Sequence, residues 1–121
     1  MTTRLFVYGT LAPGHEAWTV LEPWVVGPRQ PDSVPGCLYD TGRGYPAATF
    51  GAPTGSVVHG TVVRLDPERI LAALAALDRY EGHEYERITL LTQAGVEAAA
   101  YAWIASLAGC RAVAGGRWNH T

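Results

Sequence analysis

The sequence predicts an α+β domain, with a small mixed β-barrel-like sheet and one or two packed helices. Three observations lead to this fold class. An apolar strand pattern covers residues 4–8, a second covers residues 57–65 and runs straight into a capped helix, and a hairpin pattern covers residues 85–104. With shorter extended segments between them, the total is about six or seven strands. We expect one domain over residues 1–121, because this length can close a single hydrophobic core.

The first half of the chain carries one strong strand and several weak ones. Residues 4–8 are apolar enough for a strand buried on both faces, and the pattern over residues 15–24 predicts a short helix with Trp18 and Leu21 on one face. A short strand begins at residues 25–26, and the prolines at positions 28 and 31 should confine it to an edge. The glycine- and proline-rich residues 27–56 predict short strands and turns, around residues 38–39 and 47–50.

The second half has clearer boundaries. After the strand over residues 57–65, Asp66 is a helix N-cap, followed by Pro67 at the first helical position. The buried stripe of this helix is predicted to consist of Ile70, Leu71, Leu74 and Leu77. Residues 85–92 and 96–104 then form a hairpin around residues 93–95.

Composition excludes several classes of function. The net charge is −2 and there is no basic run, so we expect no nucleic-acid partner. No apolar segment approaches membrane-spanning length and no signal peptide is recognisable, so we expect no membrane partner and a cytoplasmic location. Cys37 and Cys110 lack CxxC spacing, which favours free thiols.

Glu81 is the first candidate for chemistry. It follows the predicted helix directly, with Tyr80 and Tyr85 beside it and Gly82 after it. The negative end of the helix dipole and two aromatic rings would disfavour the carboxylate form, raise its pKa and suit it to take up and return a proton. The alternative is a surface glutamate that precedes a glycine helix cap.

The second candidate is the turn after the first strand, at Tyr8, Gly9, Thr10 and Leu11. Gly9 would let the backbone approach a ligand closely or adopt positive φ, and exposed amides there would hold a carboxylate or a developing oxyanion. The alternative is an ordinary turn at the end of a strand.

Other polar residues give weaker signals. Arg87 would bind a substrate carboxylate or, as we favour, pair with Glu84 or Asp78. Tyrosines at positions 39, 45 and 101 would line a pocket or belong to the core. The histidines, at positions 15, 59, 83 and 120, have no metal-ligand spacing, and no nucleotide-binding motif is present, so we expect no metal and no cofactor.

Four ordered blocks of the sequence resemble the gamma-glutamylcyclotransferase-like family, which includes the gamma-glutamylamine cyclotransferases and the AIG2-like proteins. The blocks begin with Val7-Tyr8-Gly9-Thr10-Leu11 and continue through residues 36–47, 60–66 and 77–87, with a weaker match at residues 116–118. The resemblance implies a compact barrel-like sheet with packed helices, Glu81 as the catalytic acid/base, and Tyr8, Gly9, Thr10 and Leu11 as the substrate loop. The chain departs from many relatives at residues 12–16, where a basic residue and an asparagine are usual.

The resemblance also implies a reaction. We expect a cofactor-independent enzyme, a transferase or lyase in type, that cleaves a small gamma-glutamyl amide to 5-oxoproline and a free amine. Two alternatives stay open: a non-catalytic small-molecule binding module on the same fold, and a gamma-glutamyl amide hydrolase that would release glutamate. The amine leaving group and the oligomeric state are also left open.

Overall fold

Seven strands and two α-helices make up the protein in a computed structural model that describes residues 2–51 and 55–118. The α-helices are α1 (Trp18–Leu21) and α2 (Ile70–Glu81), and short 3-10 turns cover Glu22–Trp24, Pro67–Arg69 and Ala114–Gly116. The strands are β1 (Arg4–Val7), β2 (Val25–Asp40), β3 (Pro46–Phe50), β4 (Val57–Leu65), β5 (Tyr85–Leu91), β6 (Glu97–Trp103) and β7 (Arg111–Ala112).

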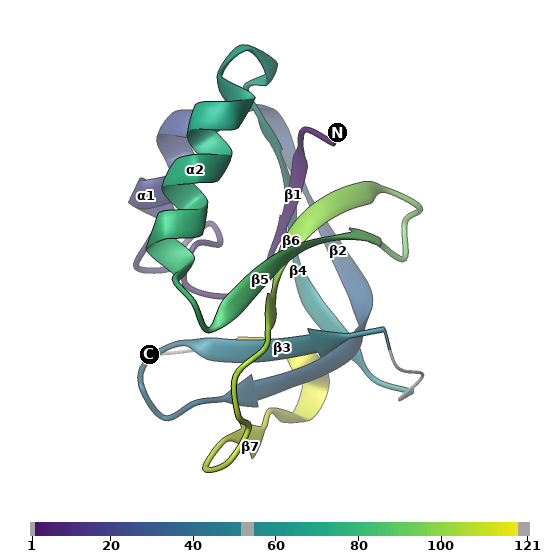
Figure 1. The fold of residues 1–121 in the computed structure, drawn as a ribbon. Helices are drawn as coiled ribbons and strands as arrows, with labels where there is room; N and C mark the ends of the chain where they lie inside the picture. Colours follow the sequence, from purple (N-terminus) through teal and green to yellow (C-terminus); the bar gives the residue numbers. More distant parts are fainter. Residues whose placement is uncertain (1, 52–54, 119–121) are drawn as a thin grey trace.

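The strands form one curled, mixed sheet. Its order is β3-β2-β4-β1-β6-β5, and β7 pairs with β2. Only the β1–β6 pair among these is parallel. Strand β3, at one end of this order, also contacts β6 near the other end, so the sheet bends into a half-barrel with α1 and α2 on one side (Figure 1). The predicted α+β class with a barrel-like sheet is therefore confirmed.

Strand β1 separates two hydrophobic clusters. Leu5 and Val7 face the cluster that includes the helix residues Leu21, Leu74 and Leu77. Phe6 and Tyr8 face the opposite cluster, inside the bend of the sheet. This alternation explains why residues 4–8 read as a continuous apolar run, since both faces of the strand are covered.

Helix α2 begins at Ile70, three residues later than predicted, and buries a slightly different stripe, because the residues that follow Asp66 form the 3-10 turn Pro67–Arg69. The Asp66 carboxylate accepts a hydrogen bond from the Glu68 amide at 3.0 Å, which caps the turn that leads into the helix. Leu74 and Leu77 are buried, but Leu71 is 71% exposed, so its predicted place in the core was wrong. Ala73 fills that position instead, because the buried positions follow the spacing 70, 73, 74 and 77.

The N-terminal helix is shorter than the predicted span of residues 15–24. Its α-helical part covers four residues and continues as the 3-10 turn Glu22–Trp24. Trp18 and Leu21 nevertheless pack on the same cluster, as the pattern predicted, and Trp24 packs there too.

Strand β2 contradicts the prediction of a short edge strand followed by short strands and turns. It runs for 16 residues and pairs with β4 from Val25 to Pro35, with a register shift between Val26 and Gln30 that takes up Pro28. Pro31, Ser33 and Pro35 are alternate residues, so their backbone groups point to the same side of the strand. The Ser33 carbonyl points away from β4 and accepts a hydrogen bond from the Gln93 amide at 2.8 Å. Pro31 and Pro35 therefore lie at positions where β2 donates no backbone hydrogen bond to β4. The missing N–H of proline costs nothing there, and the strand continues.

None of the helices in the described part of the chain is long and apolar enough to span a membrane.

Candidate active site

A small cavity lies where the end of β1 meets the carboxyl end of α2. Its volume is about 30 Å³, and Glu81 lines it together with Tyr8, Gly9, Thr10 and Leu11. The other lining residues are Phe6, Val7, Pro46, Tyr85 and Tyr101. The two candidate features, far apart in the sequence, are thus brought together at one place.

Among the described residues, Glu81 is the only carboxylate that lines this cavity, and it is partly buried. The sequence predicted Glu81 just after the helix, but it is the last residue of α2. Gly82 follows it with a φ of 81°. Burial raises the pKa of Glu81 to about 7. A group that titrates near neutrality can both accept and return a proton at ordinary pH.

The tyrosines around Glu81 are held as neutral hydrogen-bond donors. The Tyr8 hydroxyl donates to the Tyr101 carbonyl and the Tyr85 hydroxyl to the Pro46 carbonyl, both at 2.5 Å. Burial is the largest cause that raises the pKa of Tyr8, Tyr85 and Tyr101 above the usual value. None of these phenols would ionise near neutrality, so proton transfer in the cavity falls to Glu81.

The loop after β1 is fixed by its carbonyl groups. The Gly9 carbonyl accepts from the Ala12 amide at 3.0 Å, and the Thr10 carbonyl accepts from the Ala17 amide at 2.9 Å. The amides of Gly9, Thr10 and Leu11 donate to no other residue in the described part of the chain. Consecutive amides of this kind can hold an oxyanion or a carboxylate.

Of the two reasons expected for glycine at position 9, a positive φ is contradicted by the structure. A Cβ atom built there would lie 2.7 Å from Cγ of Pro46, so the ring of this proline, the first residue of β3, occupies the space that a side chain would need. Gly9 therefore allows β3 to approach the loop and close the cavity wall.

A wider chamber opens beside the small cavity. Its volume is about 510 Å³, and it shares Thr10, Glu81 and Tyr85 with the inner cavity. Glu16, Arg43, Gly44, Tyr45, Tyr80 and Glu84 complete its lining. The inner cavity alone has room for little more than a water molecule, so a larger ligand would need this chamber as well.

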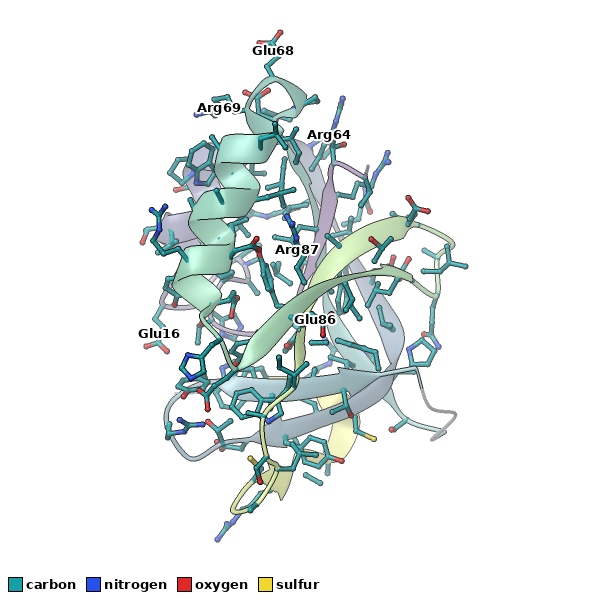
Figure 2. The ribbon with its side chains drawn as sticks, viewed as in Figure 1. Glu16, Arg64, Glu68, Arg69, Glu86 and Arg87 are labelled. Carbon is teal, nitrogen blue, oxygen red and sulfur yellow. The ribbon has the colours of Figure 1, made fainter. Side chains whose placement is uncertain are left out.

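Asp78, one turn before Glu81, anchors the end of α2 to the sheet. It accepts a hydrogen bond from the Tyr101 hydroxyl at 2.6 Å and lies 3.6 Å from the Arg87 guanidinium. Arg87 lies between β5 and α2 in Figure 2. The structural pairing favoured for Arg87 is therefore present, and it links β5 and β6 to the helix end that carries Glu81.

Sequence reasoning missed several residues at this site. Pro46, Arg43 and Glu16 line the two cavities although no local pattern pointed to them. Pro46 begins β3, and the other two lie in turns, so the place of each depends on distant pairing. Of the three tyrosines that we weighed as pocket residues, Tyr45 and Tyr101 line the cavities, whereas Tyr39 lies on β2 opposite Ala47. Within the described residues no group of three or more histidine, cysteine, aspartate or glutamate side chains could hold a metal ion; His120 lies outside those residues.

A family model confirms the resemblance seen in the sequence. The model described as Gamma-glutamyl cyclotransferase, AIG2-like, matches residues 5–120. The chain belongs to this family. Among curated proteins, none matches the sequence significantly.

Solved structures of similar fold include one that is described as an AIG2-like protein. The solution structure of Escherichia coli ytfP is 32% identical with a TM-score of 0.60, and the match covers 95% of each chain. An AIG2-like protein from Mus musculus is 21% identical with a TM-score of 0.66, over 83% of this chain and 76% of that one. YkqA from Bacillus subtilis is 21% identical with a TM-score of 0.74 over 98% of this chain, which spans only 40% of YkqA.

Proposed function

We propose that this AIG2-like protein is a cyclotransferase that cleaves a gamma-glutamyl amide to 5-oxoproline and a free amine, with Glu81 as general acid/base. The observation that carries the proposal is the shared cavity, in which one carboxylate with a pKa of about 7 faces a loop with spare amide donors. Family membership supports the kind of reaction.

The proposed reaction is an intramolecular acyl transfer. The α-amine of the substrate attacks its own γ-carbonyl carbon, a new C–N bond closes the five-membered ring, and Glu81 takes the proton from the attacking nitrogen. The C–N bond to the leaving amine then breaks, and Glu81 returns the proton to that nitrogen. Because the nucleophile is tethered to the carbonyl, little entropy is lost on reaching the reactive geometry, and no metal or cofactor is required.

The two cavities support a model in which different parts of the substrate occupy different spaces. An oxygen-sized group fits the inner cavity, so the amides of Gly9, Thr10 and Leu11 would hold the γ-carbonyl oxygen as negative charge develops on it. The closing ring would lie at the junction, where Thr10, Glu81 and Tyr85 line both spaces. The leaving amine would then extend into the chamber of about 510 Å³.

A substrate panel with product identification tests this proposal. The protein should convert at least one gamma-glutamyl amide to 5-oxoproline, measured by mass spectrometry in water enriched in oxygen-18. Cyclisation takes no oxygen from solvent, so the 5-oxoproline should be unlabelled. Labelled glutamate would show the hydrolase alternative, and binding without any product would favour the binding module.

A further inference from the structure

A third cavity lies between the loop after β1, strand β4 and the C-terminal segment. Its volume is about 280 Å³, and its walls include His15 from the loop, His59 and Thr61 from β4, and Arg117 from the C-terminal segment. Among the described residues, Tyr8 is the only one that it shares with the inner cavity, and it shares none with the wider chamber. It is therefore a space separate from the candidate active site.

The ionisable side chains of this cavity, apart from Tyr8, are all basic. Arg117 and two histidines line it, and no aspartate or glutamate in the described part of the chain does. The whole chain has eleven acidic side chains against nine arginines, so the lack of a carboxylate runs against its composition. Across residues 2–51 and 55–118, these three side chains and the Thr61 hydroxyl make no ion pair and no hydrogen bond with another residue. Their donors are thus available to a ligand.

Arg117 is held beside β4 by the residues on either side of it. A Cβ atom on Gly116 would lie 1.9 Å from the Val57 carbonyl oxygen, so the backbone of the C-terminal segment lies directly against β4, two residues before His59. Trp118 is buried in the hydrophobic cluster inside the bend of the sheet. The backbone of Arg117 cannot leave β4 without breaking these contacts, so its place at the cavity is set by the fold.

The donors select a class of ligand. A metal ion is disfavoured, because the residues that the structure describes include no group of three or more histidine, cysteine, aspartate or glutamate side chains that could hold one. An oxyanion suits these donors, since a guanidinium donates to two of its oxygens at once, and imidazole N–H and hydroxyl groups donate to the others. A carboxylate can be satisfied by one guanidinium alone. Donors from three separate elements therefore favour phosphate, whose oxygens point in more directions.

We infer that this cavity binds a phosphate-type oxyanion, as the free ion or as the phosphate group of a small molecule. The inference is independent of the proposed cyclotransferase activity. The Ala12 amide donates to the Gly9 carbonyl at 3.0 Å, and Ala12 also lines this cavity. An anion that joins His15 to β4 would therefore restrain the loop that lines the inner cavity.

Titration of the protein with phosphate, followed by the amide signals in NMR spectra at constant ionic strength, tests the inference. The shifts should saturate with a dissociation constant on the order of 1 mM and should be largest in residues 12–15, 59–61 and 117–118. Glycerol 3-phosphate should shift the same signals. Tighter binding of this ester than of inorganic phosphate would identify the phosphate group of a small molecule as the ligand, and equal or weaker binding would identify the free ion.

Two variants remove donors from the cavity. Arg117→Gln removes the guanidinium and His59→Phe removes the imidazole N–H, so each should raise the dissociation constant about three- to tenfold. The matched control is Arg64→Gln, which removes an exposed arginine near the carboxyl end of the same strand and should leave the constant unchanged.

An equal effect of Arg64→Gln and Arg117→Gln would show attraction by the overall charge alone and would overturn the inference. Equal shifts with chloride, or no saturation up to about 0.1 M phosphate, would overturn it too. Saturation by Zn²⁺ in place of phosphate would show a metal site and would likewise contradict it. None of these results would bear on the formation of 5-oxoproline, so the inference and the proposed function can fail separately.

Discussion

The burial of Glu81 sets the expected pH dependence of activity. Its carboxyl group must be unprotonated to accept the proton of the attacking amine, and burial raises its pKa to about 7. We therefore expect kcat/KM to rise with pH and to level off above about pH 7, which a pH–rate profile of 5-oxoproline formation would measure. A profile that is flat between about pH 5 and pH 8 would contradict this role for Glu81.

The same pKa shift predicts a pH dependence of stability. The folded state holds the Glu81 proton more tightly than the unfolded chain, because the pKa is raised from 4.5 to about 7. This contribution to stability is complete below about pH 4.5 and is lost as the pH rises through about 7. Glu81→Gln removes the titrating group. The free energy of unfolding of the variant, relative to that of the wild type, should therefore rise by up to about 3 kcal/mol between about pH 4.5 and pH 7.

Urea unfolding of the wild type and Glu81→Gln at about pH 4 and pH 8 would measure this effect, with Glu68→Gln as an exposed control. An unchanged difference between wild type and Glu81→Gln at the two pH values would show that Glu81 titrates as an ordinary surface group. The sequence indicated the position of Glu81 and its neighbour Tyr85, which lines both cavities with it, but not the rest of its surroundings. Tyr80 remains 45% exposed, and the buried Tyr101 comes from β6, about twenty residues further along the chain.

At the scale of elements, the contact between Gly9 and β3 controls the cavity wall. Gly9→Ala places a Cβ atom where Cγ of Pro46 lies only 2.7 Å away. We expect a loss of about 1–3 kcal/mol in the free energy of unfolding, together with lower activity, because the loop and β3 must move apart. Denaturant unfolding and steady-state kinetics of the variant would measure both effects.

A double-mutant cycle separates this clash from other causes. Pro46→Ala removes the ring atoms that meet the new methyl group and keeps the carbonyl that accepts from Tyr85. The double variant should therefore lose less stability than the sum of the two single changes. Strict additivity would mean that Pro46 is not the reason for glycine at position 9.

The end of α2 should depend on the hydrogen bond from β6. Tyr101→Phe removes the hydroxyl that donates to Asp78 at 2.6 Å and leaves the ring in place. We expect a loss of about 1–2 kcal/mol in stability, because the Asp78 carboxylate loses a donor. Thermal unfolding would measure it, and a variant as stable as the wild type would show that Arg87 alone anchors Asp78.

Elements with local signals were predicted well, and those decided by distant pairing were not. The Asp66 cap, the strand Val57–Leu65 and the hairpin of β5 and β6 were each anticipated from their own residues. Strand β2 was not, because the prolines at positions 31 and 35 are tolerated only in a register that β4 sets. The exposed Leu71 has a similar cause, since the face of α2 that is buried depends on how the helix lies against the sheet.

At the scale of the molecule, the curl of the sheet creates the site. The strand count predicted an α+β class, but closure depends on the contact between β3 and β6, which no local pattern encodes. This closure brings Pro46 on β3, Tyr101 on β6 and the end of α2 around the end of β1 (Figure 1). Glu81 and the loop after β1 could be predicted from the sequence, because each belongs to a local motif. The shape of the chamber could not, because it depends on the closure of the sheet.

The most direct test of the account compares 5-oxoproline formation by the wild type and Glu81→Gln on a gamma-glutamyl amide that the wild type converts. Loss of the acid/base group should lower the rate by about two to four orders of magnitude. The variant should remain at least as stable as the wild type near pH 8, because it no longer buries a carboxylate. Glu68→Gln, an exposed charge change at the other end of α2, should keep wild-type activity. A Glu81→Gln variant with near wild-type turnover would contradict the assignment of Glu81 as the catalytic acid/base.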